Sequence, residues 1–256
     1  MSNALTALTD VLGEVADLQR ASELVEWDER VYMPPAGAAA HGEMTATLRK
    51  VAHEKFTSSE VERLLKNASG EVASAAPDSD EARLVAVAER DFRKAVQVPG
   101  EFVARHAKAA SAAQAAWATA RQASNFGLFQ PHLERIVDLK REYASFFPRA
   151  DHPYDHLLDD YEPDLTTTEV RALFDGLRPR QVALLQAIQA RPQVDDVVLH
   201  AAFKEQDLWD FSVEVMTAFG FDWSRGRQDK SVHPFCSSVG PDDVRITTRW
   251  VPTMPL

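Results

Sequence analysis

Residues 3–31 read NALTALTDVLGEVADLQRASELVEWDERV and form the first amphipathic run of the chain. Apolar side chains recur near every third or fourth position, at Leu5, Leu8, Leu12, Val15, Leu18, Leu24 and Trp27. This spacing places them on one face of an α-helix. The run ends at Met33-Pro34-Pro35, because each proline restricts the residue before it to extended geometry. We therefore predict a long first helix with one apolar face.

Similar patterns predict helices along most of the remaining chain. Only ten glycines are present, and Ala, Leu, Glu and Arg are abundant, which favours helices. Residues 67–77 are small and polar and predict a loop, and Pro179 is expected to kink or break the helix that contains it. Further helices are expected at 38–55, 59–65, 78–95, 99–120, 131–147, 166–188 and 200–219. Three of these are expected to begin at a cap: a capping box at Ser59 and Glu62, a cap at Asp78 and Glu81, and a capping box at Thr166 and Glu169. Pro99 and Pro131 suit the first turn of two others.

The pattern changes after Gly220. From Ser231 to Arg249 there is no helical period, whereas Val244–Thr248 is rich in β-branched residues and predicts a strand. No internal repeat and no long linker interrupts the chain. The predicted fold class is mainly α, with long antiparallel helices and a small β element, residues 231–249, near the C-terminus.

Charge and cysteine content exclude several classes of protein. The formal net charge of -11 argues against a nucleic-acid partner, which requires a basic surface, and equally against an anionic membrane surface. No stretch approaches the ~20 apolar residues of a membrane span, and the N-terminus has no apolar core of signal-peptide length. Cys236 is the only cysteine, so no internal disulfide is possible. We expect a soluble cytoplasmic protein.

The histidines do not form a convincing metal site. A catalytic zinc needs about three protein ligands, and two histidines four residues apart share one helix face. Only His152 and His156 have that spacing, but Pro153 places His152 at or before a helix start, so we favour surface residues. His53-Glu54 begins like a zinc motif, yet Thr57 occupies the position of the second histidine. We assign no metal ligand and no catalytic residue.

Other candidate sites also have simpler interpretations. Cys236 follows His233 closely, but neighbours in an extended segment usually point in different directions. Four acidic residues cluster at Asp159, Asp160, Glu162 and Asp164. We favour a solvated turn over a cation site for this cluster. Core packing is the simplest interpretation of Trp27, Trp117 and Trp209.

Several segments, taken in order, resemble the carboxypeptidase Taq family of zinc metallocarboxypeptidases. The resemblance runs from about Leu12 to Arg249. Residues 231–235 read SVHPF and residues 243–249 read DVRITTR, which match the family's His-Pro-Phe and Asp-x-Arg-x-Thr signatures. The other matching stretches are WDERVYMPPAG at 27–37, LLDDYEP at 157–163 and GFDW at 220–223.

The resemblance implies an activity and a cofactor. Family members are helical proteins of roughly twice this length, usually homodimers, that remove single residues from peptide C-termini. Zinc, or cobalt in its place, activates the attacking water. Two His and a Glu hold the metal, and the Glu within His-Glu-x-x-His is the general base. That motif follows the Asp-x-Arg-x-Thr strand in the family.

Here only residues 250–256, WVPTMPL, follow that strand. We therefore interpret residues 1–256 as the N-terminal helical portion of a carboxypeptidase Taq-like domain whose metal-binding half is missing. We expect neither bound zinc nor catalysis by this chain alone. Two alternatives remain open: a regulatory module that pairs with a full-length homologue, and a non-functional fragment with an exposed apolar surface.

The resemblance also nominates substrate-binding residues, namely His233, Asp243, Arg245 and Thr247, because the two signatures lie near the family's groove. The guanidinium of Arg245 suits carboxylate recognition, but a salt bridge to Asp243 on the same strand face is an equal alternative. His233 is either a groove residue or, as we slightly favour, a buried structural histidine.

The strand at Val244–Thr248 also predicts self-association. Its usual neighbours in the family would be absent here, so at least one edge should be unpaired. We expect self-association or a homodimer through residues beyond Gly220.

Overall fold

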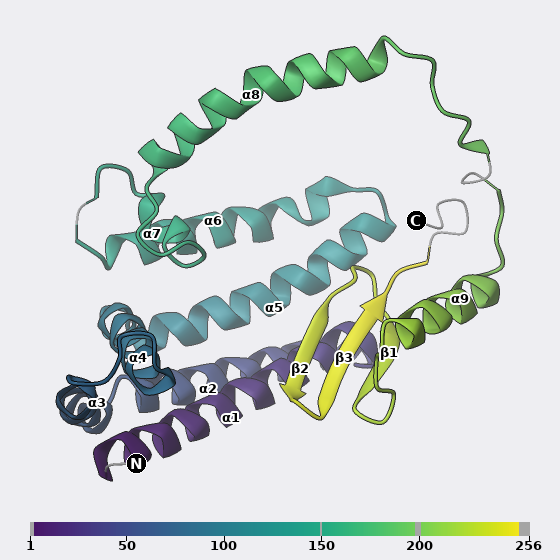
Figure 1. Ribbon diagram of the computed structural model, residues 1–256. Coiled ribbons are helices and arrows are strands. Elements are labelled where there is room, and N and C mark those ends of the chain that lie inside the picture. The colour runs from purple at the N-terminus through teal and green to yellow at the C-terminus, as the bar shows by residue number, and fades with distance from the viewer. Residues whose placement is uncertain (1–2, 149, 198–200, 251–256) are drawn as a thin grey trace. The chain divides into compact units, whose positions relative to one another are not determined.

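The computed structural model describes residues 3–148, 150–197 and 201–250, and within these ranges it is mainly α-helical (Figure 1). The predicted fold class, helices with a small β element near the C-terminus, is confirmed. None of the described helices is long and apolar enough to cross a membrane. The elements are α1 (Asn3–Val31), α2 (Ala38–Phe56), α3 (Ser59–Val72), α4 (Asp80–Ala95), α5 (Gly100–Gln122), α6 (Gln130–Ser145), α7 (Asp155–Leu158), α8 (Thr167–Gln189), α9 (Glu205–Ala218), β1 (Gly226–Lys230), β2 (Cys236–Gly240) and β3 (Asp243–Thr248), with short 3-10 helices at Pro35–Gly37 and Phe126–Leu128.

The chain divides into two compact units, and the boundary falls inside α6. One unit comprises Met1–Leu139 and Ser224–Thr248, and the other comprises Lys140–Trp223 and Arg249–Leu256. The first unit therefore joins the N-terminal helices to the three strands, which lie far apart in the sequence. All four predicted substrate-binding residues belong to it.

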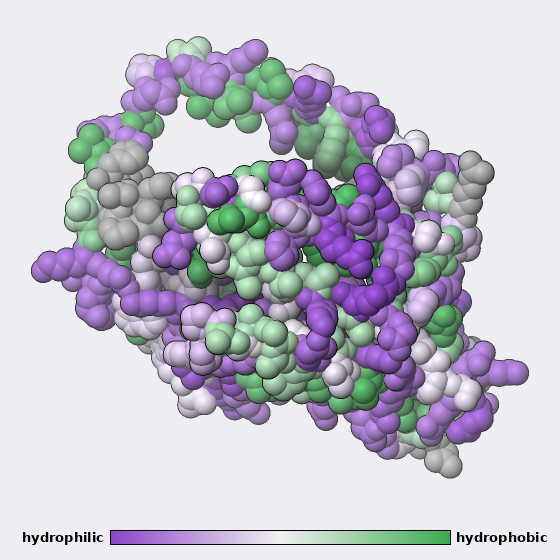
Figure 2. Space-filling model, turned by 180° about the vertical axis from the view of Figure 1, so that it is seen from behind, coloured by the Kyte–Doolittle hydropathy of each residue, from purple (hydrophilic) through white to green (hydrophobic). Residues whose placement is uncertain are grey.

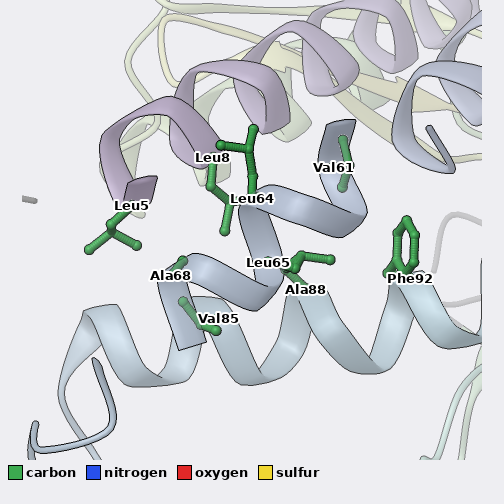
Figure 3. Close-up of a cluster of buried hydrophobic side chains, with 9 residues drawn as sticks. All are labelled: Leu5, Leu8, Val61, Leu64, Leu65, Ala68, Val85, Ala88 and Phe92. Carbon is green, nitrogen blue, oxygen red and sulfur yellow. The ribbon is translucent and has the colours of Figure 1, made fainter. Parts of the chain in front are cut away.

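The main core of the first unit lies between α1, α3 and α4 (Figure 3). Leu8 of α1 and Val61 of α3 are completely buried. Phe92 of α4 is buried and meets Phe56 edge-on, with ring centroids 6.0 Å apart. Figure 3 shows the cluster of Leu5, Leu8, Val61, Leu64, Leu65, Ala68, Val85, Ala88 and Phe92. Of the apolar positions predicted for α1, Leu5 and Leu8 lie in this core and Leu12 packs against it.

Two helix starts differ by one residue from the prediction. Ser58 caps α3 and accepts a hydrogen bond from Val61 N, and Ser79 caps α4 and accepts one from Ala82 N. Both serines have the extended backbone that an N-cap requires. The predicted caps, Ser59 and Asp78, are their neighbours in the sequence and have a similar capping ability, so residue type alone did not separate them. The loop expected at 67–77 is also shorter, because α3 continues to Val72 and buries Ala68.

Helix α8 begins at the predicted capping box and continues through Pro179. The capping box is present: Thr166 accepts from Glu169 N, and the Glu169 side chain accepts from Thr166 N. Of the two outcomes expected at Pro179, a kink or a break, the break does not occur, because α8 runs through this residue from Thr167 to Gln189. A proline removes only one i→i−4 hydrogen bond, so the flanking bonds can keep the helix continuous at a local cost of about 3 kcal/mol.

The strands form one sheet in the order β1-β3-β2. Strand β3 pairs with β1 in parallel and with β2 in antiparallel orientation. The strand predicted at 244–248 is therefore confirmed, but the unpaired edge predicted for it is wrong, because β3 is the central strand. The sequence did not predict β1, whose residues GRQDK lack an apolar alternation. Self-association through an open β3 edge consequently loses its structural basis.

Replacing Thr166 with alanine should shorten or fray the start of α8. The change removes the hydroxyl that accepts from Glu169 N, and N-cap losses typically cost about 1 kcal/mol. Circular dichroism during thermal unfolding should detect the loss. Thr168→Ala is the matched control, because Thr168 is exposed and lies inside the same first turn. Equal losses in both variants would contradict a specific capping role.

Candidate functional site

The candidate site lies on one face of the small sheet, where it meets the end of α1. The parallel register pairs Arg227 with Arg245 and Asp229 with Thr247. Successive side chains of a strand alternate between faces, so Asp243, Arg245 and Thr247 share one face of β3. Contacts with Trp27 and Tyr32 show that this face is turned toward α1, over which the sheet lies in Figure 1.

Arg245 forms a two-point ion pair with Asp243. Its Nε donates to Asp243 Oδ1 at 2.9 Å and its Nη2 donates to Oδ2 at 2.8 Å. This pair is the structural alternative predicted for the two residues. The guanidinium carbon of Arg245 also lies 4.3 Å from the centre of the Trp27 ring, within cation–π range. The Arg245 guanidinium holds the pKa of Asp243 below its ordinary value.

A second, similar pair lies beside the first on β1. Arg227 donates from Nε to Asp229 Oδ2 at 2.7 Å and from Nη2 to Asp229 Oδ1 at 2.8 Å. The Tyr32 hydroxyl donates to Asp229 Oδ1 at 2.6 Å and lies 2.9 Å from Arg227 Nη2. Burial alone would raise the pKa of Asp229, but the hydrogen bonds from Arg227 and Tyr32 outweigh it and lower that pKa. The cluster therefore ties β1 to the residue that follows α1.

Trp27 connects the two ion pairs. Its side chain is buried, as predicted, and both guanidiniums approach the ring, Arg245 at 4.3 Å and Arg227 at 5.1 Å. Tyr32 meets the same ring edge-on at 5.5 Å. The Trp27 indole nitrogen is buried without a hydrogen-bond partner among the described residues. The two arginines differ in access: the Arg227 side chain is 49% exposed, whereas that of Arg245 is 15% exposed.

Thr247 holds the His-Pro-Phe segment against the sheet. Its hydroxyl lies 2.8 Å from Phe235 N, which donates to it, and 3.0 Å from Phe235 O, which accepts. Thr247 N also donates to Phe235 O at 2.9 Å. Ser231 Oγ lies 2.8 Å from both Thr247 Oγ1 and His233 O. The geometry thus gives Thr247 a positioning role for the loop that carries His233.

His233 is exposed, so the slightly favoured expectation of a buried structural ring is wrong. Its loop connects β1 to β2 outside the strand pairing, which leaves the ring at the surface. One side of the ring meets Trp117 edge-on, with centroids 6.2 Å apart. Arg121 donates to Val232 O at 3.1 Å and lies over Trp117, which anchors the same loop to α5.

The three histidines considered as metal ligands from the sequence, His53, His152 and His156, have other partners nearby. His152 precedes α7, as predicted, and its Nδ1 accepts from Tyr154 N, while His156 stacks on Phe147. His53 Nε2 lies 2.7 Å from the carbonyl of Val98. Over residues 3–148, 150–197 and 201–250, no three His, Cys, Asp or Glu side chains converge as metal ligands do. The described residues therefore do not fit the zinc site that the family implies.

The acidic cluster forms a turn, as favoured from the sequence. Asp159 accepts from Asp164 N at 2.9 Å, and Asp164 itself has a positive φ of 68°. Asp160 accepts from the Tyr143 hydroxyl at 2.8 Å. Cys236 is exposed on β2 as a free thiol.

Sequence reasoning missed four residues of the candidate site: Trp27 and Tyr32 as site residues, and Arg227 and Asp229 altogether. A usable signal was present. Arg227-x-Asp229 and Asp243-x-Arg245 are opposite charges two residues apart, a spacing that places both on one strand face. The polar composition of β1 concealed the strand and therefore the first of these pairs.

Known proteins match almost the whole chain. The sequence model of the Carboxypeptidase Taq (M32) metallopeptidase family matches residues 7–256. Thermostable carboxypeptidase 1 of Thermus thermophilus is 31% identical over an alignment of 247 positions that covers 93% of this chain and 48% of that protein. Carboxypeptidase 1 of Bacillus subtilis is 27% identical over 242 residues, which are 94% of this chain and 48% of that protein. The chain thus spans about half the length of the curated relatives it matches.

Solved structures agree with the sequence matches. The crystal structure described as BsuCP is similar with a TM-score of 0.93 at 25% identity, over 99% of this chain and 51% of that chain. The M32 carboxypeptidase from Deinococcus radiodurans R1 is similar with a TM-score of 0.77 at 32% identity, over 99% of this chain and 50% of that chain.

Proposed function

Because the chain belongs to the Carboxypeptidase Taq (M32) metallopeptidase family, we propose that it supplies the non-metal half of a peptidase that removes residues from peptide C-termini. The observation that supports this proposal is the clustering of Asp243, Arg245 and Thr247 beside Arg227 on one sheet face. The family resemblance implies that zinc or cobalt is held by a His-Glu-x-x-His motif. That motif would lie in the half of the family's domain that residues 1–256 do not match. The metal would activate the attacking water there.

Within this half we propose different roles for the two arginines. Arg245 is largely shielded and engages Asp243 at two points, so it holds β3 and the Trp27 ring in place. Arg227 presents more of its guanidinium to solvent and is the better group to meet a peptide carboxylate. The exposed ring of His233 and the loop held by Thr247 complete the peptide-facing surface of this proposal.

The partners and compartment are also proposals. Peptide C-termini are the substrate class implied by the family. A homodimer rests on the family resemblance alone, since β3 is paired on both sides. We also propose a cytoplasmic location, in keeping with the single cysteine.

Two proteins test the function: the 256-residue chain, and a chimera that joins it to the half of Bacillus subtilis carboxypeptidase 1 that it does not match. We expect the chain alone to hold no stoichiometric zinc after dialysis and to release no residue from blocked dipeptides with added zinc or cobalt. The chimera should release C-terminal residues, and a chelator should abolish that release.

Metal-dependent release by the chain alone, lost in a His152→Ala, His156→Ala variant, would show that the metal site lies in this half. A folded, metal-loaded chimera without carboxypeptidase activity would contradict the proposed function.

The exposed apolar residues of α8 favour a second candidate function, an interaction module that pairs with another polypeptide. Figure 2 shows hydrophobic residues interspersed with hydrophilic ones at the surface along this helix. This alternative requires no catalysis by the assembled complex.

A further inference from the structure

The protein itself occupies most of the hydrogen-bonding capacity of Arg227. Its Nε donates to Asp229 Oδ2 at 2.7 Å. Its Nη2 donates to Asp229 Oδ1 at 2.8 Å and to the Tyr32 hydroxyl oxygen at 2.9 Å. Its Nη1 has no hydrogen-bond or ion-pair partner within residues 3–148, 150–197 and 201–250. The donors that remain for a ligand are therefore those on Nη1.

The Tyr32 hydroxyl has a defined direction in this cluster. It donates its proton to Asp229 Oδ1 at 2.6 Å, so its oxygen is the acceptor for Arg227 Nη2. The hydrogen bond to Asp229, and after it burial, raises the pKa of Tyr32 above its ordinary value. The hydroxyl therefore keeps its proton at neutral pH and remains an acceptor for Arg227.

This arrangement limits how a carboxylate can bind Arg227. A carboxylate binds arginine best when two nitrogens donate to its two oxygens. The planar guanidinium offers such a fork on one side through Nε and Nη2, and at its end through Nη1 and Nη2. Asp229 fills the first fork, and Tyr32 engages Nη2 of the second. An incoming carboxylate is left with Nη1.

Tyr32 and Arg227 both reach the surface, which makes this contact accessible. The Arg227 side chain is 49% exposed and Tyr32 is 58% exposed. The neighbouring Arg245 uses Nε and Nη2 on Asp243 in the same way, but its side chain is only 15% exposed and forms no hydrogen bond to a hydroxyl in the described part of the chain. The tyrosine hydroxyl thus distinguishes two otherwise similar ion pairs.

We propose that Tyr32 is a specificity-determining residue for the peptide carboxylate: its hydroxyl oxygen occupies one prong of the end fork of Arg227 and restricts the carboxylate to Nη1. The inference rests on the proposed function, which makes Arg227 the group that meets the carboxylate. A contact through one nitrogen holds a carboxylate less tightly than a fork, which favours release of the cleaved residue.

The test compares the 256-residue chain with its Tyr32→Phe variant, which loses the hydroxyl and keeps the ring beside Trp27 and Arg227. The probe is hippurate, a blocked glycine with a free carboxylate, and hippuramide is the matched ligand without that charge. Binding is followed by NMR of the isotope-labelled chain at the Arg227 Nε resonance, which is assigned by its loss in Arg227→Lys. We expect Tyr32→Phe to bind hippurate about 3–10-fold more tightly than the wild type, because Nη2 can then complete the fork. Hippuramide should not move the Arg227 resonance.

Tyr161→Phe is the matched control variant. It removes a hydroxyl from a tyrosine that is 84% exposed, so its hippurate affinity should stay within about twofold of the wild type. Loss of structure would weaken binding, so a gain of affinity in Tyr32→Phe reports the freed Nη2. A second measurement needs no variant: in the wild type, the Nη2 hydrogens should exchange with solvent more slowly than those of Nη1.

Equal or weaker hippurate binding by folded Tyr32→Phe, with a wild type that binds through Arg227, would overturn the role of Tyr32 and leave that of Arg227 intact. Equal exchange of the Nη1 and Nη2 hydrogens would also contradict it. If hippurate moved the Arg227 resonance in neither protein, the roles of both residues would be wrong. Activity of the chimera tests the carboxypeptidase function separately from all of these results.

Discussion

Replacing Asp229 with alanine is expected to lower the free energy of unfolding by about 2–3 kcal/mol. The carboxylate accepts from Arg227 at two points and from the Tyr32 hydroxyl, and only 5% of its side chain is exposed. Its loss removes the acceptor of the Tyr32 hydroxyl and leaves the Tyr32 oxygen as an acceptor for Arg227 Nη2 but none for Arg227 Nε. The value lies below that of a fully buried pair because water can reach half of the Arg227 side chain. Chemical denaturation followed by circular dichroism measures the change.

Asp242→Ala provides the control from the same part of the chain. Asp242 lies 3.3 Å from Arg225, and both side chains are more than 60% exposed. Exposed ion pairs contribute little, so this variant should lie within about 0.5 kcal/mol of the wild type. Similar losses in the two variants would contradict the special role of the Asp229 cluster.

Acid provides a second measure of the same interaction. The pKa of Asp229 and that of Asp243 are both lowered in the folded chain. Their stabilisation is therefore present above the ordinary carboxyl pKa of ~3.9 and is lost as the pH falls through the lower folded values. The wild type should lose stability more steeply than Asp229→Ala below about pH 4. Parallel curves would contradict the assignment.

Replacing Leu8 with alanine should lower the free energy of unfolding by about 2–5 kcal/mol. Leu8 is completely buried between α1, α3 and α4, so the truncation leaves a cavity that these helices can fill only in part. Leu84→Ala on α4 removes the same atoms from a side chain that is 38% exposed, and should cost less than about 1 kcal/mol. Equal costs would show that the cluster in Figure 3 does not carry the stability of this unit.

Local patterns in the sequence predicted much of the fold. The apolar spacing of α1 identified Leu5 and Leu8, which the structure buries, and the spacing of Thr166 and Glu169 identified a real capping box. These features depend on residues within one or two helical turns. The strand at 244–248 followed from its β-branched residues in the same way.

The parts that were missed depend on distant neighbours. Strand β1 is polar, and only its pairing with β3 makes it a strand. Asp229 became recognisable as a site residue only once Tyr32 and Arg227 were seen beside it. Whether the strand at Val244–Thr248 has an open edge is likewise decided by the sheet order, which no local pattern contains.

The joining of α1 to the sheet also determines when this unit can be completed during synthesis. Tyr32 and its acceptor Asp229 are separated by 197 residues. At a synthesis rate of roughly 5–20 residues per second, the ribosome needs about 10–40 s between these two positions. Throughout that interval Trp27 and Tyr32 lack both arginines. A chain that emerges from the ribosome in this order leaves this aromatic helix end without Asp229 and both arginines until the strands within residues 226–248 are made.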